Sequence, residues 1–205
     1  TQHGARVLYR QVDLGDWQQT SALVDFIAEE YGALDGILHA AGVLQDDFII
    51  RKSEASFAQV LRPKVAGAVN LDRATQSINM DFMVLFSSGV AVMGNPGQAD
   101  YAAANGFLDA FAHYRREQLG RKTLAVNWPL WAEGGMAGGE IAAHAMREAG
   151  MVALDTEAGI QALDQALMQD EAQLLVLSGE VEKLLPQLNP QTSISAVSAN
   201  AVQPV

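Results

Sequence analysis

Short hydrophobic runs alternate along the chain with longer stretches in which hydrophobic residues recur at helical spacing. The short runs are typical of buried strands, and the longer stretches are typical of amphipathic helices. The pattern predicts strands at Arg6–Val12, Leu34–Ala40, Asp81–Ser87, Lys122–Asn127 and Gln173–Ser178. It predicts helices at Trp17–Tyr31, 53–76, Ala99–Leu119, Ile141–Ala149 and Thr156–Met168. This alternation favours an α/β fold, a Rossmann-like, doubly wound parallel sheet with helices on both faces.

Polar residues, glycine and proline mark the expected limits of these helices. Asp16 is suited to cap the first helix, and Asp155 or Thr156 the last, because short polar side chains accept hydrogen bonds from free helical N–H groups. Gly120 lies just after a predicted helix, where a left-handed residue often ends one. Pro63 is expected to bend the long helix in which it lies, since proline removes an internal hydrogen bond.

The chain divides into a long patterned part and a polar tail. We expect residues 1–186 to form the catalytic part of one domain. Residues 187–205, rich in Asn, Pro, Ser and Ala, are expected to be a linker or a disordered tail. Glycines at 134–135 and 138–139 favour hinges for a lid, with a disordered surface loop as the alternative.

Composition narrows the possible partners and ligands. With 205 residues, 49% of them hydrophobic, the chain can bury one sizeable core. A net charge of −11 disfavours nucleic acid and anionic membranes as partners. No hydrophobic run is long enough to span a bilayer, and the absence of a signal segment at the N-terminus favours a cytoplasmic location. The chain has no cysteine and its histidines lack ligand spacing, so no metal site is expected.

The residues of chemical interest follow the predicted strands. In a parallel sheet the carboxyl ends of the strands meet at one edge, and ligands bind there. The segments placed at that edge are Asp13-Leu14, His39–Gly42, Ser87–Gly89 and Asn127–Pro129. We therefore expect one site that draws on several strand ends.

Three polar residues on this edge have the spacing of a proton-transfer site. Ser88 follows a strand, Tyr101 begins a helix thirteen residues later, and Asn105 lies one helical turn further on the same face. A tyrosine hydroxyl becomes a useful acid or base when a cation and a helix N-terminus stabilise its phenolate. Each residue alone is more often structural, as a strand-end cap or a half-buried helix residue. Together they favour a carbonyl reductase, whose hydride must come from a cofactor.

This constellation resembles the short-chain dehydrogenase/reductase superfamily, whose usual motif is Tyr-x-x-x-Lys. Here Asn105 replaces the lysine, which is the pattern of one subgroup, the ketoreductase domains of modular polyketide synthases and animal-type fatty acid synthases. Lys64 matches the subgroup's lysine on the preceding long helix. Further matching motifs are His39–Val43, Phe86–Ser88, Tyr101–Asp109 and Asn127–Trp131. The resemblance covers roughly residues 5 to 185 and is closest to the trans-acyltransferase type of synthase.

The resemblance implies a role for each catalytic residue. Tyr101 would protonate the alkoxide, and Ser88 would hydrogen-bond the ketone. Lys64 would lower the pKa of Tyr101 and bind the nicotinamide ribose, while Asn105 would position water or the lysine. The cofactor would be NADPH, and its binding residues would be Asp13, Leu14, His39, Ala40, Ala41, Gly42, Lys64, Tyr101, Pro129 and Leu130. His39 by itself is interpreted as a packed strand-end histidine, not a base.

The resemblance also implies a substrate and a stereochemical outcome. The substrate would be a β-ketoacyl thioester on the phosphopantetheine arm of an acyl carrier protein, within a set of neighbouring synthase domains. Asp46 in Leu44-Gln45-Asp46 matches the diagnostic residue of B-type ketoreductases, and neither Met93 nor Ala103 matches the A-type or epimerising pattern. A B1-type domain giving a D-hydroxyl is therefore predicted. The expected substrate and stereocontrol residues are Asp46, Met93, Gln98, Trp131 and Met136. Trp131 and Trp128 have core packing as an equal alternative.

One expected feature of a dinucleotide-binding sheet is not in the sequence. No Gly-x-Gly-x-x-Gly phosphate loop is present, and by family comparison the chain begins at the third strand, so the fold is expected to be truncated before its first two strands. We expect the missing half to come from the same or another polypeptide. Two alternatives stay open: a non-catalytic structural half-domain of a multidomain synthase, and a free-standing short-chain reductase of small ketones.

Overall fold

A parallel sheet forms the centre of the molecule. The computed structural model describes residues 4–134 and 146–188, and its strands are joined in the order β1-β2-β3-β4. All neighbouring strands are parallel, with His39 beside Leu85 and Ser88 beside Trp128 at their carboxyl ends. The strands are β1 (Gly36–His39), β2 (Phe82–Ser88), β3 (Thr123–Trp128) and β4 (Gln173–Leu175). The predicted parallel α/β fold is confirmed.

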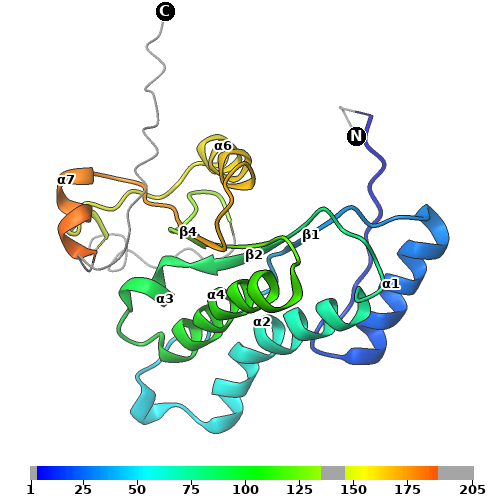
Figure 1. The fold of residues 1–205 in the computed structure, drawn as a ribbon. Coiled ribbons are helices and arrows are strands. Elements are labelled where there is room, and N and C mark those ends of the chain that lie inside the picture. The colour runs from blue at the N-terminus through cyan, green and yellow to red at the C-terminus, as the bar shows by residue number, and fades with distance from the viewer. Residues whose placement is uncertain (1–3, 135–145, 189–205) are drawn as a thin grey trace, which may run out of the picture.

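Helices cover both faces of this sheet (Figure 1). Helices α2 and α4 lie together on one face, α6 lies on the other, and α1 packs beside α2. The α-helices are α1 (Trp17–Tyr31), α2 (Glu54–Ala74), α3 (Gly89–Met93), α4 (Ala99–Leu119), α6 (Thr156–Leu167) and α7 (Val181–Leu184). Two short 3-10 helices, η1 (Ile49–Arg51) and η2 (Leu185–Gln187), complete the described elements. The short elements α3, η1, α7 and η2 were not predicted, because one or two turns leave no periodic pattern.

The caps expected from the sequence are present. The carboxylate of Asp16 accepts a hydrogen bond from the Gln19 N–H, and that of Asp155 accepts one from the Ala158 N–H. Gly120 has a φ of 62° and ends α4 in the left-handed region. The two aspartates satisfy N–H groups that a helix start leaves unpaired, which explains why α1 and α6 begin as predicted, and Gly120 explains why α4 ends as predicted.

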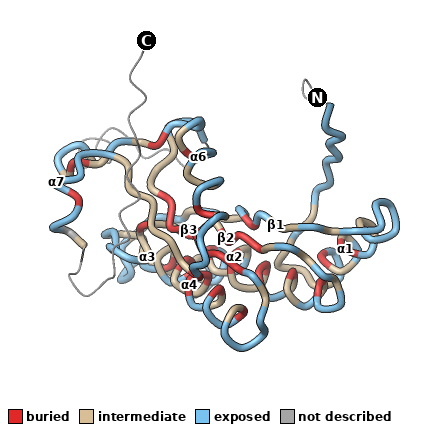
Figure 2. Tube along the Cα trace, turned by 45° about the horizontal axis from the view of Figure 1, so that its top comes forward, coloured by how far each residue is buried: buried red, intermediate tan, exposed pale blue. Residues whose placement is uncertain are grey.

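Each face of the sheet has its own core because strand side chains alternate between faces. Met83 and Leu85 pack under α2 and α4, whereas Val84 and Val126 pack under α6. Buried residues follow β2, β3 and the inner sides of α2 and α4, and the β1 side of the sheet is more exposed (Figure 2). The core thus holds the carboxyl ends of β2 and β3 in place.

The predicted strand at Arg6–Val12 is wrong. Residues 5–13 have no regular secondary structure, and no neighbouring strand pairs with them in the described part of the chain. The segment lies alongside α1 instead. The Arg6 guanidinium is 2.9 Å from the carboxylate of Glu30, and the Arg10 guanidinium is 3.6 Å from the ring centroid of Phe26. A hydrophobic run becomes a strand only when a partner satisfies its backbone groups.

Several expectations lie wholly or partly outside the described residues. They are the glycine hinges beyond Gly134, the first part of the helix at Ile141–Ala149, Met136 and the tail from residue 189. Residues 146–148 of the expected helix are helical. Among the helices of the described ranges, none combines the length and apolarity that a membrane crossing requires.

Candidate active site

Three elements bring the four predicted catalytic residues together. Ser88 ends β2, Tyr101 and Asn105 lie in the first turns of α4, and Lys64 lies in the middle of α2. The Ser88 hydroxyl accepts a hydrogen bond from the Val90 N–H at 3.3 Å and so caps α3. The capping role and the proposed chemical role are therefore carried by the same oxygen.

Lys64 is a buried cation beneath the tyrosine. Only 3% of Lys64 is exposed, and its Nζ donates a 2.7 Å hydrogen bond to the Phe86 carbonyl. The same Nζ lies 5.7 Å from the centroid of the Tyr101 ring. Burial lowers the pKa of Lys64 to about 8, although the nearby Asp109 carboxylate opposes this shift. Part of the lysine population is therefore neutral just above neutral pH.

The Tyr101 hydroxyl has a raised pKa. Burial raises the pKa of Tyr101 above its usual value, and hydrogen bonds with Asn105 and Ser88 offset only part of that rise. The negative charge of Asp46 raises it further. We expected Lys64 to lower this pKa, and the net direction is the opposite. The reason is that burial has the largest effect on the phenol.

Asn105 holds the helix end on which the tyrosine lies. Its Nδ2 donates a 2.7 Å hydrogen bond to the Tyr101 carbonyl, one turn earlier in α4, and Asn105 is fully buried. The Ser87 hydroxyl donates to the Asn105 carbonyl at 3.2 Å, which ties this turn of α4 to the end of β2. Asn105 and Ser87 together thus connect the turn of α4 that carries Tyr101 to the end of β2 that carries Ser88.

A buried polar network below the site was missed by sequence reasoning. The Asn127 Nδ2 donates to the Asp109 carboxylate at 2.9 Å, to the Ser87 hydroxyl at 3.0 Å and to the Ser88 carbonyl at 3.1 Å. The Gln173 Nε2 donates to the Asn127 Oδ1 at 2.9 Å. Burial raises the pKa of Asp109. The one available signal was that Asp109 falls on the same α4 face as Tyr101 and Asn105.

The residues expected to hold the cofactor lie along the carboxyl edge. Ala40 is exposed, and Ala41 and Gly42 are half-buried just after β1. No large side chain directly follows β1 at this edge, and the Lys64 ammonium and the Tyr101 phenol are groups that can hydrogen-bond ribose hydroxyls and a carboxamide. The residues present therefore fit a nicotinamide. Asp13 is exposed and 2.9 Å from the Arg62 guanidinium, Leu14 is half-buried, and Pro129 and Leu130 follow β3 half-buried.

His39 is fully enclosed. It is 2% exposed, and burial together with the Lys64 charge lowers its pKa to about 4. A Cβ on Gly67 would come within 3.2 Å of its ring, so α2 packs tightly against it. This placement matches a packed strand-end histidine.

The expected stereocontrol residues fall into two groups. The Gln98 Nε2 donates to the Asp46 carboxylate at 2.8 Å, and both lie near Tyr101. Met93 ends α3 and is 36% exposed. Trp131 is half-buried and packs against the core, with its ring centroid 5.0 Å from that of Trp128 and its edge close to Gly159 of α6.

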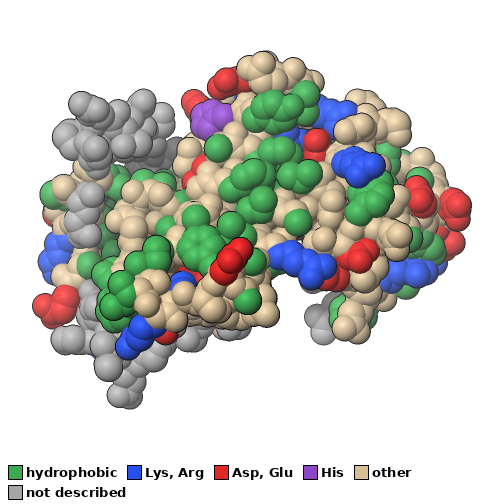
Figure 3. All heavy atoms as spheres, turned by 90° about the horizontal axis from the view of Figure 1, so that it is seen from below, with side chains coloured by type: hydrophobic (Ala, Val, Ile, Leu, Met, Phe, Trp, Pro, Cys, Tyr) green, Lys and Arg blue, Asp and Glu red, His purple; other side chains and the backbone are tan. Residues whose placement is uncertain are grey.

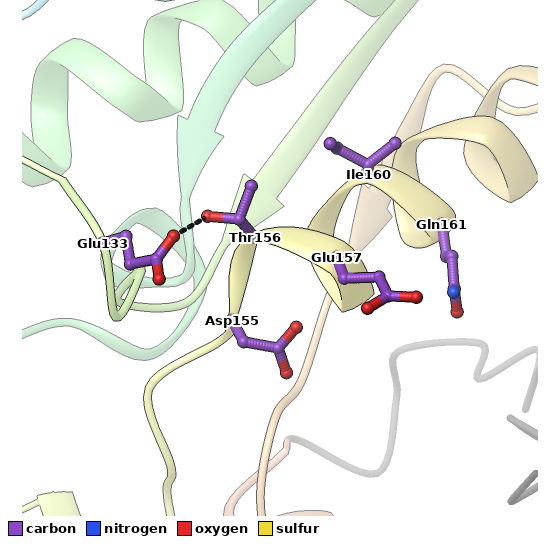
Figure 4. Close-up of a pocket in the computed structure, with 6 residues that line it drawn as sticks. All are labelled: Glu133, Asp155, Thr156, Glu157, Ile160 and Gln161. Carbon is purple, nitrogen blue, oxygen red and sulfur yellow. Dashed lines mark hydrogen bonds between the residues drawn. The ribbon is translucent and has the colours of Figure 1, made fainter.

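A separate hollow opens beside the start of α6. It has a volume of about 460 Å³ and is lined by Glu133, Asp155, Thr156, Glu157, Ile160 and Gln161. The Thr156 hydroxyl donates to the Glu133 carboxylate at 2.7 Å across its rim (Figure 4). Among the described residues no group of His, Cys, Asp and Glu is arranged to hold a metal ion. The hollow shares no residue with the Tyr101 site.

Comparisons with known proteins show the family of the chain. The family model of the KR domain matches residues 1–133. Polyketide synthase PksL of Bacillus subtilis is 46% identical over 187 residues, which cover 88% of this chain and 4% of that protein. PksN of the same organism is 40% identical over 98% of this chain and 4% of its own length. The chain thus spans a small part of these relatives.

Solved structures show the same architecture. A ketoreductase domain from the bacillaene assembly line has a TM-score of 0.86 at 41% identity, covering 91% of this chain and 46% of that chain. An N-terminal ketoreductase from the macrolactin assembly line has a TM-score of 0.83 at 41% identity, covering 91% and 36%. The chain belongs to the KR domain family and has the Rossmann-like fold of the ketoreductases of polyketide synthases, which are nicotinamide-dependent reductases.

Proposed function

We propose that the chain catalyses the NADPH-dependent reduction of a β-ketoacyl thioester, held on an acyl carrier protein, to the β-hydroxyacyl thioester. The observation that carries this proposal is the convergence of Ser88, Tyr101, Asn105 and Lys64 at the carboxyl edge of a parallel sheet. The family membership and the polyketide synthase relatives support it. We place the chain in a cytoplasmic, trans-acyltransferase type synthase, beside neighbouring synthase domains.

The proposed chemistry is an acid-assisted hydride transfer. NADPH, when bound, supplies the hydride to the ketone carbon. The Ser88 and Tyr101 hydroxyls hydrogen-bond the ketone oxygen, and Tyr101 donates its proton as the alkoxide forms. The raised pKa of Tyr101 suits this direction because the phenol stays protonated at neutral pH. Lys64 lies close enough to the ring to stabilise the phenolate left behind.

The carboxyl edge would receive the cofactor in a defined order. Asp13 would lie near the adenine, Ala41 and Gly42 along the ribose, and the backbone of Pro129 and Leu130 beside the carboxamide. The pyrophosphate would be held by a preceding part of the fold, supplied in the same or another polypeptide.

Exchange of the tyrosine tests the proposal. In the full-length protein, Tyr101→Phe should lower kcat by about 100-fold to 10,000-fold, because the proton donor is lost while the ring stays. NADPH oxidation with a carrier-bound β-ketoacyl substrate is the measurement. Tyr114→Phe is the matched control, since Tyr114 lies in the same helix and is 47% exposed.

Two outcomes would contradict the assignment. Full activity of Tyr101→Phe would remove the tyrosine from the reaction, and an inactive wild-type protein that still folds would favour the structural half-domain. Chiral chromatography of the product tests the stereochemical part. Asp46 in the B-type position predicts a D-hydroxyl, and an L-hydroxyl would refute the B-type assignment.

A further inference from the structure

A buried ion pair lies beside the tyrosine, outside the four reacting residues. Lys52, just before α2, pairs with Asp100 in the first turn of α4, and the two side chains are 3% and 1% exposed. The Lys52 Nζ also donates a hydrogen bond to the Gln45 carbonyl. One ammonium therefore joins both ends of loop 45–52 to the start of α4.

The carboxylate of this pair is in direct contact with the tyrosine backbone. The Asp100 Oδ1 accepts a 2.9 Å hydrogen bond from the Tyr101 N–H, while the Asp100 Oδ2 faces Lys52. An N–H in the first turn has no partner within its own helix, so this contact helps to set where α4 begins. A movement of Lys52 would therefore move the Asp100 carboxylate and, through it, the backbone of Tyr101.

Two further contacts tie the same loop to the same turn. The Gln98 Nε2 donates to the Asp46 carboxylate at 2.8 Å, and the Asp47 N–H donates to the Gly97 carbonyl at 3.0 Å. The charge of Asp46 is felt at Tyr101 and raises its pKa. Loop 45–52 therefore lines one side of the space in front of the phenol.

Stability alone does not explain a buried pair at this place. Removing two charges from water costs several kcal/mol per ion, and hydrophobic residues of similar volume often stabilise a fold equally well or better. What such a pair adds is a fixed geometry between two segments that are distant in the chain.

We propose that Lys52 and Asp100 form a positioning pair that holds loop 45–52 against Tyr101 and so fixes the face from which the ketone reaches the proton donor. The inference rests on the proposed reductase function and names residues that control its stereochemical outcome. Lys52 and Asp100 touch neither substrate nor cofactor in this scheme. They act through Asp46 and Tyr101.

The experiment compares single and double variants in the full-length protein. Lys52→Met and Asp100→Asn should each lower the melting temperature, because each leaves a buried charge without its counter-charge. The double variant Lys52→Met/Asp100→Leu should regain most of the melting temperature. Its kcat/KM for a carrier-bound substrate should still fall by about 10-fold to 100-fold, as expected for a misplaced reacting centre. Its product should contain both hydroxyl configurations.

The controls separate positioning from folding. Arg51→Gln removes the neighbouring exposed cation of the same loop, 62% exposed and paired with Asp47, and should leave the product configuration unchanged. If the double variant does not fold, Lys52→Arg and Asp100→Glu keep the charges but change the reach, and each should give a mixed product. A single configuration and unchanged kinetic constants in the folded variants would overturn the positioning role. A wild-type protein that folds but reduces no thioester would refute the proposed function itself.

Discussion

Burial acts on two neighbouring basic residues near the site. His39 at the end of β1 and Lys64 in α2 both lose water, and the pKa of each falls, to about 4 and about 8. His39 is therefore neutral at physiological pH, while Lys64 is close to its titration point. Of these two residues, Lys64 is the one whose charge can change near neutral pH. This supports Lys64, and not His39, as the group that responds to proton transfer.

The neutral state of His39 predicts an acid-sensitive fold. Its pKa is near 6.5 in an unfolded chain and about 4 here, so between these values the unfolded chain holds more protons. The stabilisation is fully present above pH 6.5 and is lost as pH falls towards 4, by roughly 3 kcal/mol in total. Urea unfolding of His39→Gln across this window should show a smaller loss of stability than the wild type.

The exposed His113 provides the control for this measurement. His113→Gln should keep the wild-type pH dependence. If His39→Gln loses stability as steeply as the wild type between pH 6.5 and 4, the buried imidazole is not the sensitive group.

At the scale of elements, local sequence features were enough to predict most helices, whereas features that depend on contacts between distant parts of the chain could not be predicted. Helix α1 was predicted to the residue because Asp16 and its periodic hydrophobic residues are local features. The segment Arg6–Val12 was predicted wrongly because a strand depends on a partner that no local pattern reveals. Tyr101 and Asn105 were placed together by helical spacing, whereas the Lys52–Asp100 pair joins residues 48 positions apart and left no trace in the local pattern.

A second buried ion pair holds the helices below the site. The Arg115 guanidinium is 1% exposed, lies 2.8 Å from the Asp72 carboxylate and donates to the Thr123 hydroxyl at 2.7 Å, joining α4, α2 and β3. Asp72→Ala should lower the free energy of unfolding by about 3–5 kcal/mol, since it leaves a buried guanidinium unpaired. Chemical denaturation measures this loss.

The matched variant removes both charges of this pair. Asp72→Ala/Arg115→Met should be more stable than Asp72→Ala alone, because no buried charge is left without a partner. Equal stability of the two variants would contradict this expectation, because removal of the unpaired guanidinium would then bring no gain in stability.

At the scale of the whole molecule, hydrophobic surface is unevenly covered. Helix α6 lies over β3 and β4, and Leu38 on β1 is 53% exposed on that same face of the sheet. Val7 and Tyr9, in the segment before α1, are 74% and 85% exposed. Figure 3 shows further hydrophobic side chains gathered on the opposite face, over α2 and α4. Surfaces of this kind mark sites where other protein packs.

The uncovered face of β1 predicts association of the 205-residue chain when it is produced alone. Sedimentation should show a mass that rises with concentration, and Leu38→Lys should reduce this rise. Met168→Lys, which changes an 85% exposed residue just after α6, should have less effect. A monomer at every concentration would contradict the prediction.

The placement of the cation on α2 and of the tyrosine on α4 has a further consequence. When an ammonium and a phenol lie on one helix, the geometry of that helix sets the distance between them, and the distance does not change when the helix moves as a rigid body. Here the 5.7 Å between the Lys64 Nζ and the Tyr101 ring depends on how closely two helices pack. In the proposed reaction, the rate should therefore depend on how closely α2 packs against α4, and a contact that shifts one helix relative to the other should change turnover without altering a reacting group.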